Sequence, residues 1–305
     1  MQKIKLLGIA ALTVVVLCAC GEGSVNESIT GESAAKESGT EENGTDESNV
    51  RKEPLRIVTT IFPLYDWTRE LLGDRAAEAE LTLLLDDGVD LHSYQPTSSD
   101  ILQISACDVL VYVGGESDEW VEDALKEAVN PHMVVVNCME ELSDFVKEEE
   151  VVEGMEAEEE PDEEDGGIVA EEVEYDEHIW LSLKNAARCC KALADALCFA
   201  DPAGEAVYRT NEKAYGEKLA ALDMRYAEAA EAGVRRTLLF GDRFPFRYLA
   251  DDYGLTYFAA FTGCSAETEA SFATVVFLAQ KTDELSLPVI LTIEGKEHRI
   301  AETIR

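Results

Sequence analysis

The stretch PLRIVTTIFPLYDWTRELLG, residues 54–73, joins a predicted strand to a predicted helix. Its β-branched run at 55–60 is typical of a strand, and Pro63 favours a helix start before Gly73 ends the helix. The same alternation recurs along the chain, and further strands are predicted at 81–85, 108–113, 134–137, 237–240, 256–261 and 289–293. Strands that alternate with helices predict an α/β fold whose parallel sheets are covered on both faces.

A long helical segment separates the two groups of strands. Residues 183–199 carry apolar residues at helical spacing, and Asp201-Pro202 starts a second helix that continues to about Ala232. Thirty residues in a helix form a rod of roughly 45 Å, which is longer than an ordinary crossover helix. We therefore predict two parallel-sheet α/β lobes joined by a long rigid helix.

The chain divides by composition into five parts. They are a lipoprotein signal peptide (residues 1–20), a flexible tether (21–53), an N-terminal α/β lobe (54–182), the inter-lobe helices (183–233) and a C-terminal α/β lobe (234–305). The C-terminal lobe has fewer predicted strands than the first, and the helical pattern at Arg305 has no stop signal. We expect this lobe to be truncated, with a naturally small lobe as the alternative.

The net charge of −38 limits the classes of partner. Nucleic-acid binders need a basic face, and docking on anionic lipid needs basic clusters, so we expect neither interaction. Cations are favoured instead. Residues 148–177 hold 17 acidic residues and no Lys or Arg, and we predict an acidic, disordered loop there. This loop is either a solvated insertion or a weak collector of cations near the binding cleft.

The N-terminus indicates the compartment. Lys3 and Lys5 precede an apolar run at 6–17, which is too short for a comfortable membrane span. The sequence LCACG that follows resembles a bacterial lipobox, in which Cys20 becomes the lipidated N-terminus. An ordinary secretory signal or an uncleaved anchor is the alternative. The polar composition of 21–53 is typical of a flexible tether, so we expect an extracytoplasmic protein anchored to the outer face of the cell membrane.

The remaining cysteines show no zinc-ribbon spacing and no CxxC pair. They are Cys107, Cys138, Cys189, Cys190, Cys198 and Cys264. Buried small residues are one interpretation, and disulfides are possible outside the cell. The sequence does not decide between them.

The chain has only four histidines, and three of them lie where a ligand would bind. His92 and His298 each follow a predicted strand, and the carboxyl ends of parallel strands are where α/β proteins bind ligands. His178 lies at the start of the first inter-lobe helix. Each alone could be a surface or capping residue, but together they favour a site for Zn²⁺ or a similar ion. His132 has no such placement.

Several motifs together show a family resemblance. Residues 54–305 resemble the zinc/manganese ABC-transporter substrate-binding lipoproteins, which bind one divalent metal between two α/β lobes joined by a rigid helix. The resemblance is carried by segments 88–97, 176–182, 201–219 and 248–255. It implies that His92 and His178, which lie in the first two segments, are metal ligands.

Two departures from the family pattern affect the other ligands. Where the family has a third ligand, His or Glu, this chain has Arg243, and a guanidinium cannot bind a metal ion. The adjacent Asp242 either replaces that ligand or pairs with Arg243. Where some members have a fourth-site Asp, this chain has His298, which we expect to offset the loss. Glu297 is the alternative ligand.

These observations predict a binding protein rather than an enzyme. We expect a monomeric metal receptor that captures Zn²⁺, or alternatively Mn²⁺, and delivers it to the membrane permease of an ABC transporter. The expected ligands are His92, His178, His298 and Asp242. The alternative function is a surface adhesion or interaction lipoprotein with a structural metal. Neither a P-loop nor an HExxH motif is present to indicate catalysis.

Overall fold

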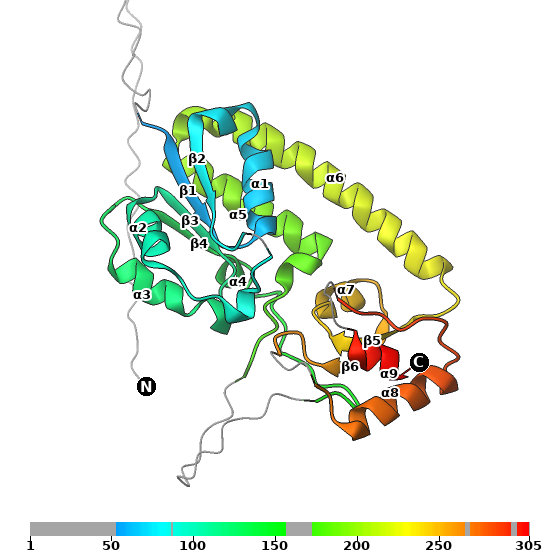
Figure 1. The fold of residues 1–305 in the computed structure, drawn as a ribbon. Coiled ribbons are helices and arrows are strands. Elements are labelled where there is room, and N and C mark those ends of the chain that lie inside the picture. The colour runs from blue at the N-terminus through cyan, green and yellow to red at the C-terminus, as the bar shows by residue number, and fades with distance from the viewer. Residues whose placement is uncertain (1–52, 87, 157–172, 266–268, 294–297, 305) are drawn as a thin grey trace, which may run out of the picture. The chain divides into compact units, whose positions relative to one another are not determined.

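Two parallel sheets organise the protein, as Figure 1 shows. The computed structural model describes residues 53–86, 88–156, 173–265, 269–293 and 298–304. The predicted signal peptide and tether lie outside these residues, and so does Cys20.

The larger sheet has the strand order β2-β1-β3-β4, with every pair parallel. Its strands are β1 (Leu55–Thr59), β2 (Ala79–Leu83), β3 (Val109–Tyr112) and β4 (Val134–Asn137). The chain leaves β1 to form β2 on one side and later returns to form β3 on the other. The carboxyl ends of β1 and β3 therefore make a topological switch point, the place where open α/β sheets bind ligands.

Helices cover this sheet and follow the predicted alternation. They are α1 (Phe62–Leu72), α2 (Ser98–Ala106), α3 (Trp120–Lys126), α4 (Cys138–Glu141), α5 (Leu183–Ala200) and α6 (Glu205–Ala232). Helix α1 has proline in its first turn and ends at Gly73, as the sequence predicts. Thr97 caps α2 through a reciprocal pair of hydrogen bonds with Asp100.

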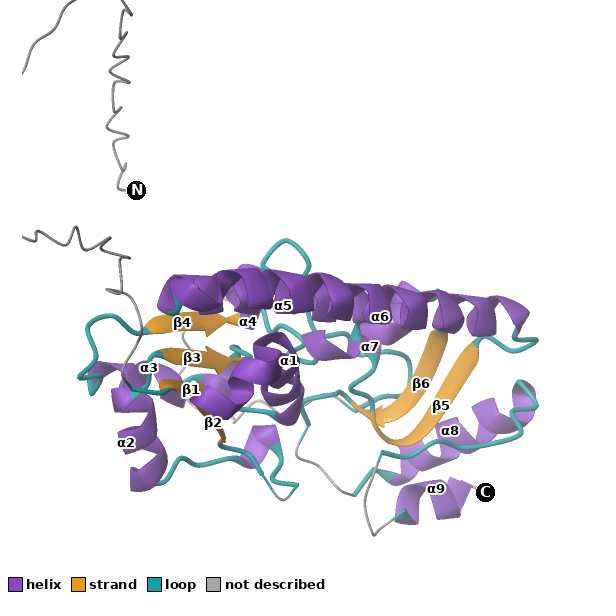
Figure 2. Cartoon of the chain, turned by 90° about the horizontal axis from the view of Figure 1, so that it is seen from above, coloured by secondary structure: helices purple, strands orange, loops and turns teal. Residues whose placement is uncertain are grey.

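Helix α6 has 28 residues and is therefore about 42 Å long. Along its first half it lies against α1 and α5, an arrangement visible in Figure 2. Its buried Tyr208 donates a hydrogen bond to Asp201 at 2.5 Å. In its second half, Tyr226 stacks on Tyr253, whose hydroxyl donates to Asp223. The helix thus contacts the regions around both sheets.

The smaller sheet pairs two parallel strands, β5 (Thr237–Arg243) and β6 (Thr256–Phe261). Helices α7 (Arg247–Asp252), α8 (Phe272–Glu284) and α9 (Arg299–Ile304) accompany it. Aromatic side chains form much of the packing on one face, where Phe244 stacks on Tyr257 with ring centroids 3.8 Å apart.

The predicted strand at 289–293 is wrong, because the segment makes only an isolated bridge between Leu291 and Phe240. Pro288 has no N–H to donate to a neighbouring strand. Beyond the bridge, the N–H of Ile293 donates to the Asp242 carboxylate at 3.1 Å instead of to a backbone carbonyl. A side chain therefore takes the hydrogen bond that would have extended the ladder.

The prediction that residues 148–177 form a disordered loop is wrong at both ends of this run. The N–H of Glu149 donates to the carbonyl of Glu174, and the N–H of Glu156 donates to the carbonyl of Ala260. Met155 is buried against the smaller sheet. The first end has this structure because its apolar residues Val152 and Met155 pack on the smaller sheet, and the second end is held by backbone hydrogen bonds to residues 147–149. Its central part, 157–172, lies outside the described residues.

The prediction of a parallel-sheet α/β fold is confirmed. The described residues fall in one compact unit, so the division into two lobes stays a prediction. The six cysteines of the described part are free thiols. Among the helices of this part, none is both long and apolar enough to cross a membrane.

Tyr248 on α7 provides a test of how the region around α7 is held to the segment that precedes α5. Its buried hydroxyl donates to the carbonyl of Asp176 at 2.7 Å and accepts from the N–H of Lys147 at 3.0 Å. We expect Tyr248→Phe to lower the free energy of unfolding by about 1–3 kcal/mol, because the buried carbonyl of Asp176 and the half-buried N–H of Lys147 lose their partner. Urea denaturation measures this. Tyr257→Phe is the control, since that hydroxyl binds the exposed Glu150, and an equal loss in both variants would contradict the assignment.

Candidate metal centre

Two imidazole rings face each other at the carboxyl edge of the larger sheet. His92 lies in a turn after β2, and His178 lies directly before the turn that leads into α5. Their Nε2 atoms are 3.2 Å apart. Two nitrogen ligands of a tetrahedral zinc ion, each about 2.0–2.1 Å from the metal, lie about 3.3 Å apart. The pair therefore matches one edge of a zinc tetrahedron.

The opposite nitrogen of each ring is held by an oxygen. Nδ1 of His178 lies 3.0 Å from the Asp176 carboxylate. Nδ1 of His92 lies 2.8 Å from the Ser117 hydroxyl and 3.6 Å from the Glu177 carboxylate. An Nδ1–H that donates to oxygen leaves the Nε2 lone pair free for a metal, an arrangement that is common behind metal-bound histidines.

Local backbone interactions set these positions. The Asp90 side chain accepts the N–H of His92 at 3.1 Å and so shapes the turn that carries the imidazole. Gly115 has a φ of +83°, and a Cβ at this position would come within 2.4 Å of a Glu177 oxygen. Glycine therefore lets the loop after β3 close on Glu177, whose same oxygen accepts the N–H of Ser117 at 2.8 Å.

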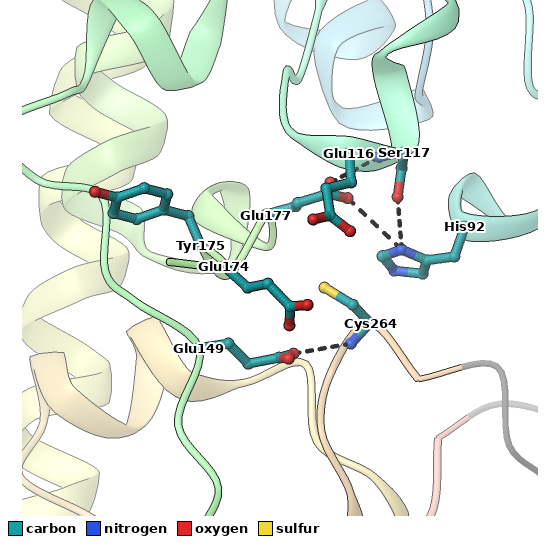
Figure 3. Close-up of a pocket in the computed structure, with 8 residues that line it drawn as sticks. All are labelled: His92, Glu116, Ser117, Glu149, Glu174, Tyr175, Glu177 and Cys264. Atoms are coloured by element: carbon teal, nitrogen blue, oxygen red, sulfur yellow. Dashed lines mark hydrogen bonds and ion pairs between the residues drawn. The ribbon is translucent and has the colours of Figure 1, made fainter. Parts of the chain in front are cut away.

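A sulfur atom lies beside the histidine pair. Cys264 follows the carboxyl end of β6, and its Sγ atom and one nitrogen each of His92 and His178 lie within 4.8 Å of one another. Figure 3 shows the thiol next to the His92 ring. Cys264 follows a predicted strand, as His92 does, but a lone cysteine carries no metal-binding pattern in the sequence.

An acidic cavity of about 240 Å³ adjoins these side chains (Figure 3). Its lining includes His92, Cys264 and four glutamates: Glu116, Glu149, Glu174 and Glu177. Glu177 is only 2% exposed, and its Oε2 atom finds no hydrogen-bond partner among the described residues. Burial raises the pKa of Glu177. A concentration of carboxylates around imidazole and thiol favours a bound cation.

The other predicted ligands are not part of this group among the described residues. The Asp242 carboxylate accepts two backbone N–H groups, from Arg243 and Ile293. His298 is half-buried before α9, and its Nδ1 finds no partner within the described part of the chain. Both ligand assignments stay predictions. Glu297 lies outside the described residues.

Arg243 pairs with Asp90 rather than with Asp242. Its guanidinium forms an ion pair with the Asp90 carboxylate and donates to the carbonyl of Ser265 at 3.3 Å. Although burial acts in the opposite direction, this guanidinium lowers the pKa of Asp90. One side chain from β5 thus connects the loop that carries His92 with the loop that carries Cys264.

Comparison with known proteins identifies the family. Residues 57–305 match the family model "ZnuA: Zinc-uptake complex component A periplasmic", and the chain belongs to this family. The chain is 28% identical over 250 residues to the zinc-binding lipoprotein AdcA of Streptococcus pneumoniae, a match that covers 82% of this chain and 47% of AdcA. It therefore spans about half the length of these AdcA relatives. It is 28% identical over 298 residues to the high-affinity zinc uptake system protein ZnuA of Bacillus subtilis, covering 98% of this chain and 83% of that protein.

Solved structures agree with this assignment. The Zn(II)-bound ZnuA-like domain of Streptococcus pneumoniae AdcA has a TM-score of 0.61 at 25% identity, covering 82% of this chain and 83% of that one. The metal-dependent lipoprotein YcdH from Bacillus subtilis has a TM-score of 0.62 at 27% identity, with the same coverage. Both solved structures therefore have a fold similar to the one described above.

The buried position of His92 predicts a pH dependence of stability in the metal-free protein. Burial, together with the nearby His178 and Arg243, lowers the pKa of His92 to about 4. An unfolded histidine has a pKa of about 6.5, so the unfolded chain takes up this proton first as the pH falls. The contribution of His92 is therefore complete above about pH 6.5 and is lost between about pH 6.5 and 4, by up to about 3 kcal/mol.

Urea denaturation of the wild type and of His92→Gln at pH 7.5 and pH 5 measures this effect. The variant should lose less stability than the wild type between the two pH values, because glutamine does not titrate. Parallel losses in the two proteins would show that His92 is not protected from protonation.

Proposed function

We propose that this protein is an extracytoplasmic receptor that binds Zn²⁺ and delivers it to the membrane permease of an ABC-type importer. The observation that carries the proposal is the pair of Nε2 atoms of His92 and His178, 3.2 Å apart, each with its Nδ1 held by oxygen. Membership of a zinc-uptake family supports it, and so do the names of the relatives.

Zinc fits this site better than manganese, which remains the alternative cargo. Two neutral imidazoles at this separation suit a tetrahedral ion of borderline softness. Mn²⁺ prefers more oxygen ligands. His298 is proposed as an additional imidazole ligand, with Asp242 or Glu297 as the carboxylate.

The proposed role is capture and release of the ion, without catalysis. The acidic cavity beside the histidine pair gives an arriving cation a favourable electrostatic path from solvent. Deprotonated ligands are needed for binding, so protons compete with the metal. Such a site can bind its ion tightly and still release it when the geometry of the loops changes.

Titration calorimetry with Zn²⁺ tests the ligands. We expect one Zn²⁺ per molecule, and we expect His92→Ala and His178→Ala to weaken binding by at least about 10-fold, or about 1.4 kcal/mol. His132→Ala is the matched control, because this histidine is exposed and lies before β4. Wild-type affinity in either of the first two variants would overturn the proposal.

The same measurement on His298→Ala and Asp242→Ala decides the remaining ligands. A loss in His298→Ala assigns that imidazole to the metal, whereas unchanged affinity removes it from the site. Zinc uptake by cells that carry His178→Ala in place of the wild type then tests delivery to the permease. Uptake should fall at low external zinc if the receptor supplies the importer.

The lipid anchor is part of the proposal. Cys20 in the sequence LCACG supplies the thiol for lipidation, and several relatives are named lipoproteins. We expect Cys20→Ser to move the protein from the membrane fraction into the medium or the soluble extracytoplasmic fraction. The neighbouring Cys18→Ser should leave fractionation unchanged. Membrane retention of the Cys20 variant would show that another segment holds the protein.

A further inference from the structure

We infer that Cys264 is a third metal ligand, which binds the ion as a thiolate together with His92 and His178. This inference rests on the proposed function, because it concerns the same metal. It assigns to Cys264 the ligand position that Arg243 cannot fill, in place of the carboxylate of Asp242 or Glu297, so that the tetrahedral ion keeps four ligands.

The distances allow a His₂Cys site. The two Nε2 atoms already have the separation of zinc ligands, and the Cys264 sulfur lies within 4.8 Å of one ring nitrogen of His92 and one of His178. A Zn–S bond of about 2.3 Å and a Zn–N bond of about 2.0–2.1 Å place sulfur and nitrogen about 3.6 Å apart in a tetrahedron. The sulfur therefore needs to approach by at most about 1.2 Å.

The backbone directly before Cys264 lies against the imidazole of His178. A Cβ on Gly263 would lie 3.1 Å from Nδ1 and Cε1 of His178, so glycine permits this loop to lie against the imidazole. The N–H of Cys264 donates to the Glu149 carboxylate at 3.4 Å. The thiol lines the same cavity as His92, as Figure 3 shows.

Arg243 explains how the loops stay together without contributing a ligand. It forms an ion pair with Asp90, two residues before His92, and donates to the carbonyl of Ser265, directly after Cys264. The arginine thus fixes the two loops on which an imidazole and the thiol lie. In this proposal the Arg243 guanidinium positions the two loops, and the Cys264 sulfur binds the metal.

A buried carboxylate at the same place points independently to a cation. Glu177 is 2% exposed, its Oε2 has no hydrogen-bond partner in the described part of the chain, and it lines the cavity together with Cys264. A buried carboxylate oxygen without a hydrogen-bond partner is costly, and a cation among these ligands would compensate for it.

A thiolate ligand determines which metals the site accepts. Sulfur is a soft ligand that favours Zn²⁺, and Cd²⁺ by the same softness, over Mn²⁺. As the metal–sulfur bond forms, the thiol proton is released to solvent. The proposed site therefore discriminates against manganese more strongly than a site of imidazoles and carboxylates.

Cobalt substitution tests the metal–sulfur bond directly. Reduced wild-type protein titrated with Co²⁺ should develop the intense near-ultraviolet band of sulfur-to-cobalt charge transfer. Cys264→Ser should lack this band and bind Zn²⁺ at least about 10-fold more weakly. Cys198→Ser is the matched control, because Cys198 is also a half-buried free thiol but is not part of the group. A wild-type band in Cys264→Ser, or bound Co²⁺ without the band in the wild type, overturns the inference.

Alkylation of the unmodified protein gives a second test that does not depend on a variant folding correctly. Zn²⁺ should protect Cys264 from iodoacetamide in the wild type and leave the reactivity of Cys198 unchanged, as peptide mass analysis measures. Equal labelling of Cys264 with and without bound Zn²⁺ contradicts the inference. If the wild type binds no Zn²⁺, the proposed function fails as well, whereas equal Zn²⁺ affinity of wild type and Cys264→Ser removes only the role of the thiol.

Discussion

The approach of two imidazole nitrogens to 3.2 Å is the constraint on which the rest of the site depends. Two Nε2 lone pairs cannot face each other at this distance without a positive charge or a shared proton between them. Oxygen partners behind each ring hold the Nδ1 atoms and so keep the lone pairs directed at each other. The fold meets this constraint by placing the loops after β2 and β3 and the segment before α5 at one sheet edge.

Carboxylates surround the His92–His178 pair, some beside the rings and others in the adjoining cavity. Asp176 and Glu177 are buried beside the rings, and Glu116, Glu149 and Glu174 line the cavity next to them. The nearer carboxylates lie against the Nδ1 sides of the two rings, and the others give the adjoining cavity a negative potential. The net charge of the whole chain is large, but it is this local arrangement that selects a binding position.

Much of the fold could be predicted because its signals are local. Strand runs, Pro63 and Gly73 predict the parallel α/β alternation, and the position of His92 after a predicted strand predicts that it lies at the sheet edge. The prediction of a strand at 289–293 was wrong because Asp242, which is distant in the sequence, accepts a hydrogen bond from the backbone of this segment. The prediction of disorder across the whole acidic run was wrong because it rested on charge alone. The run also contains a few apolar residues, such as Met155, which pack on the smaller sheet.

Cys264 could not be assigned in advance for a related reason. A single cysteine has no periodicity, and its relation to the histidines depends on contacts between segments far apart in the chain. The motif comparison excludes Arg243 on chemical grounds, because a guanidinium has no lone pair for a metal, and it indicates Asp242 and His298 as replacements. The structure instead brings together side chains from three separate segments.

The ion pair between Arg243 and Asp90 also restricts how this site could change by single substitutions. Replacing Arg243 with histidine would introduce a possible ligand but leave the Asp90 carboxylate without its cation and release the Ser265 carbonyl. Residues that share partners in this way show non-additive effects. The effects of substitutions at Asp90 and Arg243 are therefore coupled, so a histidine introduced at position 243 removes the cation that faces Asp90, two residues before His92.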